Sequence, residues 1–189
     1  MKVLGVLGSP RLGGNSDILL DQALAGARDA GAEVEKIVLC RKKISGCLAC
    51  EKCNETGVCV LKDDMPEIHG KILEADAIIH SVPTYFWAMT SQMKAYLDRW
   101  CAFFDAEWSW QKAYYPKMKG KKIGLITVCG DSNVSTADPI VHSFKMTCDF
   151  TKLKWLGVVQ ASASAKGEIA SNEAAKKAAY NLGKKGVTG

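Results

Sequence analysis

Apolar residues, mainly Val, Ile and Leu, gather in five short runs along the chain, at residues 2–7, 34–39, 77–82, 122–129 and 155–162. Within the runs the apolar positions are mostly continuous instead of alternating with polar ones. Such runs are typical of strands that are covered on both faces, as in a parallel sheet. The pattern therefore predicts five strands of one parallel sheet.

Between these runs, apolar positions recur with helical spacing. In the segment 16–29 one face carries Leu19, Leu20, Ala23, Leu24 and Ala27. Four further helices are expected at 65–74, 88–103, 139–151 and 172–185. Asn15 and Ser16 are expected to cap the first helix, and Pro66 falls in the first turn of the second. Strands and helices alternate throughout, which predicts an α/β domain with helices on both faces of the sheet.

Composition supports one ordinary globular domain, residues 1–189, with 48% hydrophobic and 24% charged residues. The net charge of +5 is spread along the chain without a basic stripe interleaved with aromatics, so nucleic-acid binding is not expected. The first apolar run is too short for the core of a signal peptide, and no run approaches the roughly 20 apolar residues of a membrane span. We expect a cytoplasmic protein that does not bind membranes.

The loop after the first predicted strand has the composition of an anion site. Residues 8–16 read Gly-Ser-Pro-Arg-Leu-Gly-Gly-Asn-Ser and lead into a helix. Free backbone N–H groups at a helix N-terminus bind anions, and Arg11 adds positive charge. The loop lacks both the Lys-Ser/Thr of a P-loop and the Gly-x-Gly-x-x-Gly of a dinucleotide site. A terminal phosphate monoester fits better, and a tight, well-capped turn is the alternative.

Four of the eight cysteines fall within thirteen residues, as Cys47-x2-Cys50-x2-Cys53-x5-Cys59. Thiolates spaced in this way can wrap one face of an iron–sulfur cluster. Two alternatives remain: structural zinc, which more often uses two separated cysteine pairs, and a bare or disulfide-forming loop. The other cysteines are expected to be buried core thiols: Cys40, Cys101, Cys129 and Cys148.

The anion loop also carries a family resemblance. Gly-Ser-Pro-Arg followed by Gly-Asn-Ser resembles the FMN-phosphate loop of the NADPH-dependent FMN reductase family, a branch of the flavodoxin-like fold. A second block, residues 82–99, resembles that family's loop after the third strand and the helix that follows. The resemblance implies a sheet of order 2-1-3-4-5 with FMN in the crevice at the carboxyl ends of its strands. The implied FMN-binding residues are Ser9, Arg11, Gly14, Asn15, Ser16, Pro83, Thr84, Tyr85, Phe86, Trp87, Thr127, Cys129 and Gly130.

One position departs from the family pattern, because Trp87 stands where relatives often have a small residue. Its bulk is expected to restrict which substrates reach the flavin. The cysteine motif, in a loop at 46–60 after the second strand, resembles that of archaeal and bacterial iron–sulfur flavoproteins. That resemblance implies a 4Fe-4S cluster beside the flavin, with ligands Cys47, Cys50, Cys53 and Cys59.

The same resemblance implies an FMN-dependent oxidoreductase that passes electrons between the cluster and FMN. The implied donor is a ferredoxin-type carrier or NAD(P)H, and the acceptor is a quinone, an oxygen species or a flavin. The alternatives are a cluster-free NAD(P)H-dependent FMN or quinone reductase, and a non-enzymatic electron carrier or redox sensor. The family also implies a homodimer or homotetramer.

Two surface features bear on partners. Arg41, Lys42 and Lys43 precede the cysteine loop and are expected to dock an acidic electron carrier. The segment 104–121 is rich in aromatic residues, which are rarely left bare in water. We expect it either to cover the cofactor or contact another subunit, with Trp108, Trp110 and Tyr114 as anchors, or to form a satellite core.

Overall fold

The computed structural model describes all 189 residues and contains one sheet of five parallel strands. The strand order β2-β1-β3-β4-β5 is the predicted one. Every predicted strand is present, with ends that differ by at most one residue. Their bounds are β1 (Lys2–Leu7), β2 (Glu33–Val38), β3 (Ala77–Pro83), β4 (Lys122–Cys129) and β5 (Lys154–Ser162).

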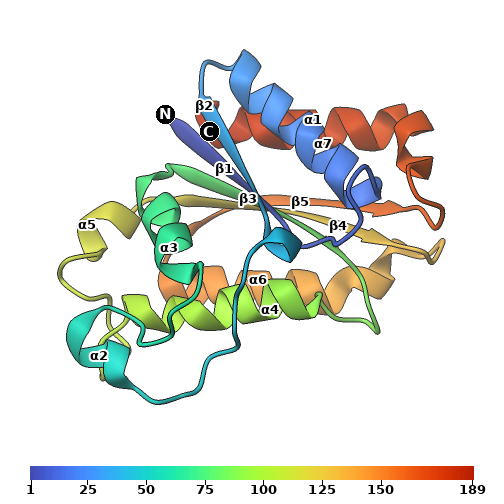
Figure 1. Ribbon diagram of the computed structural model, residues 1–189. Helices are drawn as coiled ribbons and strands as arrows, with labels where there is room; N and C mark the ends of the chain where they lie inside the picture. The colour runs from blue at the N-terminus through green and yellow to red at the C-terminus, as the bar shows by residue number, and fades with distance from the viewer.

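Helices cover both faces of the sheet (Figure 1). One face carries α1 (Asn15–Asp29) and α7 (Glu173–Thr188), and the other carries α3 (Met65–Glu74), α4 (Ser91–Asp98) and α6 (Asp138–Thr151). Each face encloses its own apolar core, of 19 and 23 buried residues respectively. Short elements complete the chain: η1 (Leu39–Arg41), α2 (Lys52–Thr56), η2 (Arg99–Phe103), α5 (Tyr115–Met118), η3 (Val134–Ala137) and η4 (Glu168–Ser171). None of the helices combines the length with the apolar composition that a membrane-spanning helix needs.

The helix expected at 88–103 is shorter than the apolar spacing indicated. Its α-helical part begins at Ser91, because Thr90 caps it by accepting a hydrogen bond from the backbone N–H of Met93 at 3.3 Å. The preceding residues Phe86 and Trp87 have left-handed backbone angles, φ +47° and +58°, which no helix continues. At the other end, residues 99–103 tighten into the 3-10 helix η2.

The capping expected from Asn15 and Ser16 is wrong. Gly14 occupies the N-cap position of α1, without a side-chain cap, and Asn15 is the first helical residue. The Asn15 amide instead reaches the loop after β5, where it donates to the carbonyls of Ala163 and Ala165 at 3.3 and 2.8 Å. The start of α1 is therefore held by the loop after β5 and not by a side-chain cap.

Helices α1 and α7 touch through their backbones at two glycines. A Cβ atom on Gly183 would lie 1.7 Å from the carbonyl oxygen of Ala23, and one on Gly26 would lie 2.0 Å from that of Tyr180. Only glycine permits so close an approach. Helix α7 thus holds α1, and with it the loop after β1, against the sheet.

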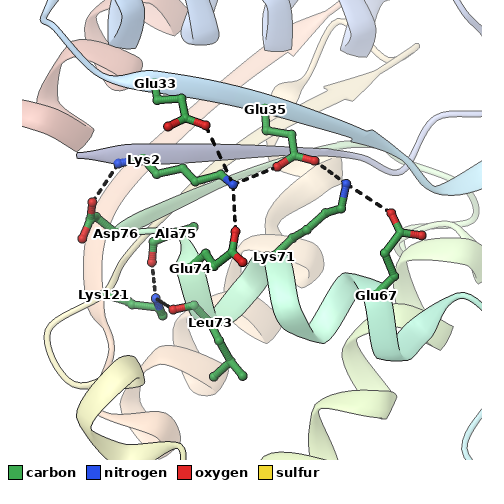
Figure 2. Close-up of polar contacts among 10 residues, drawn as sticks. All are labelled: Lys2, Glu33, Glu35, Glu67, Lys71, Leu73, Glu74, Ala75, Asp76 and Lys121. Atoms are coloured by element: carbon green, nitrogen blue, oxygen red, sulfur yellow. Dashed lines mark hydrogen bonds and ion pairs between the residues drawn. The ribbon is translucent and has the colours of Figure 1, made fainter.

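Figure 2 shows a chain of ion pairs at the amino end of the sheet. The Lys2 ammonium lies 3.2 Å from Glu35 and 2.9 Å from Glu74, and Lys71 pairs with both Glu35 and Glu67. These groups are partly exposed, so each pair contributes modestly to stability. Together they tie α3 to β1 and β2, and α3 is the element that directly follows the cysteine loop.

Candidate functional site

A cleft of 210 Å³ opens at the carboxyl ends of the strands. It is lined by Ser9, Arg11, Gly14, Asn15, Ser16, Pro83, Thr84, Tyr85, Val128, Cys129, Gly130, Ala163, Ser164 and Lys166. A neighbouring hollow of 220 Å³ shares Thr84, Cys129 and Gly130 and adds Phe86, Trp87 and Thr136. The structure therefore brings nearly all of the expected cofactor-binding residues to one place, as the strand order requires.

One end of the cleft is built for an anion. The first backbone N–H groups of α1, at Asn15 and Ser16, have no acceptor within the chain. Gly14 has no room for a side chain, since a Cβ there would lie 2.8 Å from the Arg11 carbonyl oxygen. Arg11 and Lys166 both line this end and are exposed to solvent. Free N–H groups, a helix N-terminus and two cations suit a phosphate.

The residues after β5 are a part of the site that the sequence analysis missed. Besides its bonds to Ala163 and Ala165, Asn15 accepts a hydrogen bond from the Ile169 backbone N–H at 3.2 Å. These contacts hold Ser164 and Lys166 beside the cleft. The available signal was topological: β5 lies beside β4, so the loop that follows it must open at the same edge of the sheet.

The other end of the cleft is aromatic. The Thr84 backbone N–H donates to Val128 across to β4 at 2.8 Å, and Tyr85 and Ala88 then pair in a tight turn. At the tip of this turn Phe86 is 93% exposed and Trp87 is 62% exposed. Two adjacent non-glycine residues with positive φ are strained, and such strain is found at binding sites. The turn presents aromatic faces to which a planar ring can bind.

A buried hydroxyl lies between these two ends. Thr84 Oγ1 is inaccessible to solvent and has no hydrogen-bond partner, although Thr84 lines the cleft. Buried polar atoms are nearly always paired. Of the residues with an unpaired buried polar atom, Thr84 is the one that lines the cleft, so its hydroxyl is a candidate contact for a ligand. An anion end, an orphaned hydroxyl and an aromatic end fit the phosphate and ring of FMN.

One expected contact is not placed as predicted. Thr127 is fully buried in β4, its hydroxyl also lacks a partner, and the residue does not line the cleft. Strand residues alternate between faces, so Val128 and not Thr127 faces the ligand side. Cys129, at the tip of β4, does line the cleft, and its thiol donates to the Asp131 carbonyl at 3.4 Å.

The cysteine loop lies away from this cleft. None of its residues lines the cleft, and Figure 1 places α2 near the end of α4 that is remote from the carboxyl edge of the sheet. Helix α4 begins shortly after the turn at residues 85–88, which forms the aromatic end of the cleft. It leads into η2, which contacts α2. The cysteine loop and the cleft are therefore separate within one chain, and a cluster close to the flavin stays a prediction.

The loop carries the right donors for an iron–sulfur cluster. Cys47 and Cys50 are exposed, Cys59 is partly buried and Cys53 is buried in α2. Burial, followed by negative charge on the other loop cysteines, raises the pKa of Cys53. The four thiols fit a cluster in kind and number, but no group of three or more Cys, His, Asp or Glu side chains converges on a metal-binding position.

Two of the remaining cysteines are not the core thiols that were expected. Cys129 and Cys148 are buried, but Cys40 is exposed and Cys101 is partly exposed. Cys40 lies in η1, a surface turn, and Cys101 lies in η2 beside the cysteine loop. Burial and the nearby Cys47 thiol raise the pKa of Cys101 to about 11. The apolar residues that flank Cys40 and Cys101 in the sequence suggested burial and gave no sign of this exposure.

The aromatic segment 104–121 does not cover the cleft. Phe104 is part of the core on the α4 and α6 side, and Trp110 and Tyr114 pack against it, so these residues extend the main core instead of forming a separate satellite core. Trp108 remains 58% exposed. The segment also braces the cysteine loop, because the Tyr114 hydroxyl donates to the Gly57 carbonyl at 3.0 Å.

Comparison with known proteins agrees with the site. A family model described as NADPH-dependent FMN reductase matches residues 1–147. An iron–sulfur flavoprotein from Archaeoglobus fulgidus is 40% identical over 128 residues, which cover 68% of this chain and 54% of the relative. Another from Methanocaldococcus jannaschii is 42% identical over 99 residues, covering 52% and 51%. The chain spans about half the length of these curated relatives.

Other relatives match over nearly the whole chain. A Bacillus subtilis protein described as an NAD(P)H-dependent FMN-containing oxidoreductase is 26% identical over 183 residues, covering 96% of both chains. The solved structure of the Trp repressor binding protein from Bacillus subtilis superposes with a TM-score of 0.73 and 25% identity, covering 95% of this chain and 99% of that one. Because the family model spans β1 to α6, and with them the two loops that form the anion and aromatic ends of the cleft, the chain belongs to the NADPH-dependent FMN reductase family.

Proposed function

We propose that the protein is an FMN-dependent oxidoreductase. The observation that carries this proposal is the cleft itself, in which free N–H groups and two cations lie at one end, strained aromatics at the other, and an unpartnered hydroxyl between them. Bound FMN supplies the one- and two-electron chemistry, and the protein supplies binding and orientation. The family and its FMN-containing relatives support the same cofactor.

The chain's own residues would act at three places. The start of α1, with Arg11 and Lys166, would hold the phosphate group. Thr84 would orient the ring by a hydrogen bond from its buried hydroxyl. Phe86 and Trp87 stand open to solvent beside the ring position, where the donor or acceptor must approach, so the bulk of Trp87 would limit substrate shape. No acid–base pair is needed, since hydride and electron transfer are carried by the cofactor.

We further propose that Cys47, Cys50, Cys53 and Cys59 ligate a 4Fe-4S cluster. The similarity to iron–sulfur flavoproteins supports it, and so does the presence of four cysteines within thirteen residues of one loop. A cluster moves one electron at a time, so it would link FMN to a one-electron carrier such as ferredoxin. Because the loop and the cleft lie at opposite ends of α4, we propose a homodimer or homotetramer that can bring one chain's cluster near another chain's flavin.

The second candidate is a cluster-free NAD(P)H-dependent reductase of flavins or quinones. The specific observation in its favour is that the four thiols do not converge on one metal position. A non-enzymatic electron carrier or redox sensor is a third possibility, distinguished by the lack of catalytic turnover. A carrier exchanges electrons with proteins only, whereas a reductase consumes NAD(P)H in the presence of a small acceptor.

The test is anaerobic purification with iron, acid-labile sulfide and FMN counted in the same sample. Four irons and four sulfides per chain, with FMN bound, are expected for the relay. Flavin without iron after reconstitution would leave the cluster-free reductase, with NADPH oxidation as its assay. A protein that binds no FMN at micromolar concentration would contradict the whole proposal.

Docking of an acidic carrier can be tested on the basic residues before the loop. Lys42 is paired with Glu67 at 2.9 Å, whereas Arg41 and Lys43 are exposed without such a partner. Neutralising Arg41 and Lys43 together to Gln should slow reduction by ferredoxin about three- to tenfold at low salt and weaken its salt dependence. Lys42→Gln should have less effect. An unchanged rate in the double variant would remove this surface as the docking site.

A further inference from the structure

We propose that Arg99 is a positioning residue for the cysteine loop: it joins the two ends of the loop and holds a buried positive charge against Cys59. The joining of the loop ends concerns the folded chain without any bound group. The role of the charge rests on the proposed cluster, since a charge beside a ligand sulfur alters the electronic properties of the bound group.

Arg99 is buried, with 1% of its surface exposed, at the point where α4 passes into η2. Its guanidinium donates two hydrogen bonds to the Asp63 carboxylate, from Nη1 to Oδ2 at 2.6 Å and from Nη2 to Oδ1 at 3.1 Å. Nη1 also donates to the Ser45 carbonyl at 3.0 Å. Asp63 in turn accepts from the Ser45 backbone N–H at 3.0 Å. Residues 45 and 63, which bracket the cysteine loop, therefore meet at one side chain.

Two features show that this is more than an ordinary surface ion pair. The side chains of Arg99 and Asp63 are 1% and 8% exposed, so the pair is shielded from solvent and salt. The guanidinium also lies beside the Cys59 thiol, and Arg99 Nε is buried without a partner. Arg99 therefore keeps one N–H donor free inside the fold, on a planar guanidinium whose positive charge can stabilise a nearby thiolate.

The middle of the loop is held separately. Gln111 Nε2 donates to the Cys53 carbonyl at 2.8 Å, and Tyr114 donates to the Gly57 carbonyl. Cys47 and Cys50 are exposed, and neither receives a hydrogen bond from Gln111 or Tyr114. Arg99 joins both ends beside a second contact, in which the Asp64 N–H donates to the Lys43 carbonyl at 2.9 Å and the Lys43 N–H donates to the Asp64 carboxylate at 2.8 Å. Its effect on the loop can be separated from that of the aromatic segment.

The charge is tested by the reduction potential of the reconstituted cluster in the full chain, measured by EPR-monitored titration. Arg99→Gln removes a positive charge and should shift the potential to more negative values. Asp63→Asn removes the compensating carboxylate and should shift it to more positive values. Each shift is expected to be about tenfold in the ratio of oxidised to reduced cluster, which is about 59 mV for one electron. Structural damage alone would not give opposite signs.

The controls decide the outcome. Arg28→Gln removes an exposed arginine from α1 and should leave the potential unchanged. Shifts of the same sign in both test variants, or none in either, would overturn the electrostatic role of Arg99. If Arg99→Gln does not fold, Asp63→Asn alone still gives the decisive sign.

The anchoring is tested in the cluster-free protein by limited trypsin digestion, so that failure of the cluster proposal leaves this test intact. Lys52, in the loop, is exposed and is the cleavage site to follow. Arg99→Lys keeps the charge but loses the two-pronged grip on Asp63, and cleavage should accelerate about tenfold through easier local opening. Arg28→Lys should be cleaved like the wild type. Equal rates in wild type and Arg99→Lys would refute the anchoring.

Discussion

The unpartnered hydroxyl of Thr84 predicts that one substitution will raise the stability of the apoprotein and weaken its binding of FMN. Replacing Thr84 by Val keeps the shape of the side chain and removes a buried polar atom that has no partner in the cofactor-free protein. Burying such a group costs about 1–3 kcal/mol, so the free energy of unfolding of the apoprotein should rise by about 1 kcal/mol. For a domain of this size the melting temperature should rise by about 2–4 °C.

Binding of FMN should respond in the other direction. If the hydroxyl donates to the flavin, its loss removes a hydrogen bond that contributes about 0.5–1.5 kcal/mol, which corresponds to a Kd about 2- to 12-fold weaker. Fluorescence quenching of FMN gives the Kd, and thermal unfolding without FMN gives the stability. The variant is therefore expected to be a more stable apoprotein and a poorer holoprotein.

Thr127→Val is the matched control. Its hydroxyl is also buried without a partner, but the residue does not line the cleft. It should stabilise the apoprotein similarly and leave the Kd for FMN unchanged. Equal weakening in both variants would mean that a general change in the sheet, and not a lost contact, causes the effect. An unchanged Kd for Thr84→Val would refute the assignment of this hydroxyl to the flavin.

Three further predictions concern stability, pH and the phosphate end. Gly183→Ala should lower the free energy of unfolding in urea by about 3 kcal/mol or more, because its Cβ would overlap a backbone oxygen of α1. Gly186→Ala is the control and should be near neutral, because the nearest atom to its Cβ would be 3.6 Å away. Burial lowers the pKa of His69 to about 4, below the 6.5 of the unfolded chain. The free energy of unfolding should therefore fall as the pH is lowered from about 6.5 to about 4, and His69→Gln should reduce that fall. An equal fall in the variant would exclude His69 as its source. Arg11→Ala and Lys166→Ala should each weaken FMN binding about fivefold at low salt without changing riboflavin binding, and equal losses for both ligands would contradict phosphate contact.

Much of the fold followed from the sequence, for physical reasons that can be named. The buried strands are apolar on both faces, so their positions and the parallel sheet were predictable, and the strand order came from the family resemblance. The errors arose where a distant partner overrides local signals. Asn15 has the chemistry of a helix cap but is used to hold the loop after β5. The spacing of residues 88–103 suggests one helix, but the strained turn at Phe86 and Trp87 delays its start.

The site was predictable where its residues are contiguous and not where they converge from afar. The loops after β1 and β3 carry local motifs, whereas Lys166 reaches the cleft only because β5 lies next to β4. The pairing of Asp63 with Arg99 joins residues 36 positions apart. Nothing in the local sequence of either residue indicates that pair, since Asp63 suggests a helix start and Arg99 an ordinary helical position.

The meeting of Ser45 and Asp63 at one guanidinium has a consequence for how such proteins diversify. A segment that leaves and re-enters a domain at one point can change its length at little cost, because closure entropy grows slowly with loop length. None of the strand pairings involves residues 46–62. The segment contacts the rest of the fold through Gln111 and Tyr114, but none of its residues lines the cleft, so replacing it by a short turn should leave the cleft intact. A fold of this kind can accept different loops at this position without rearranging its sheet.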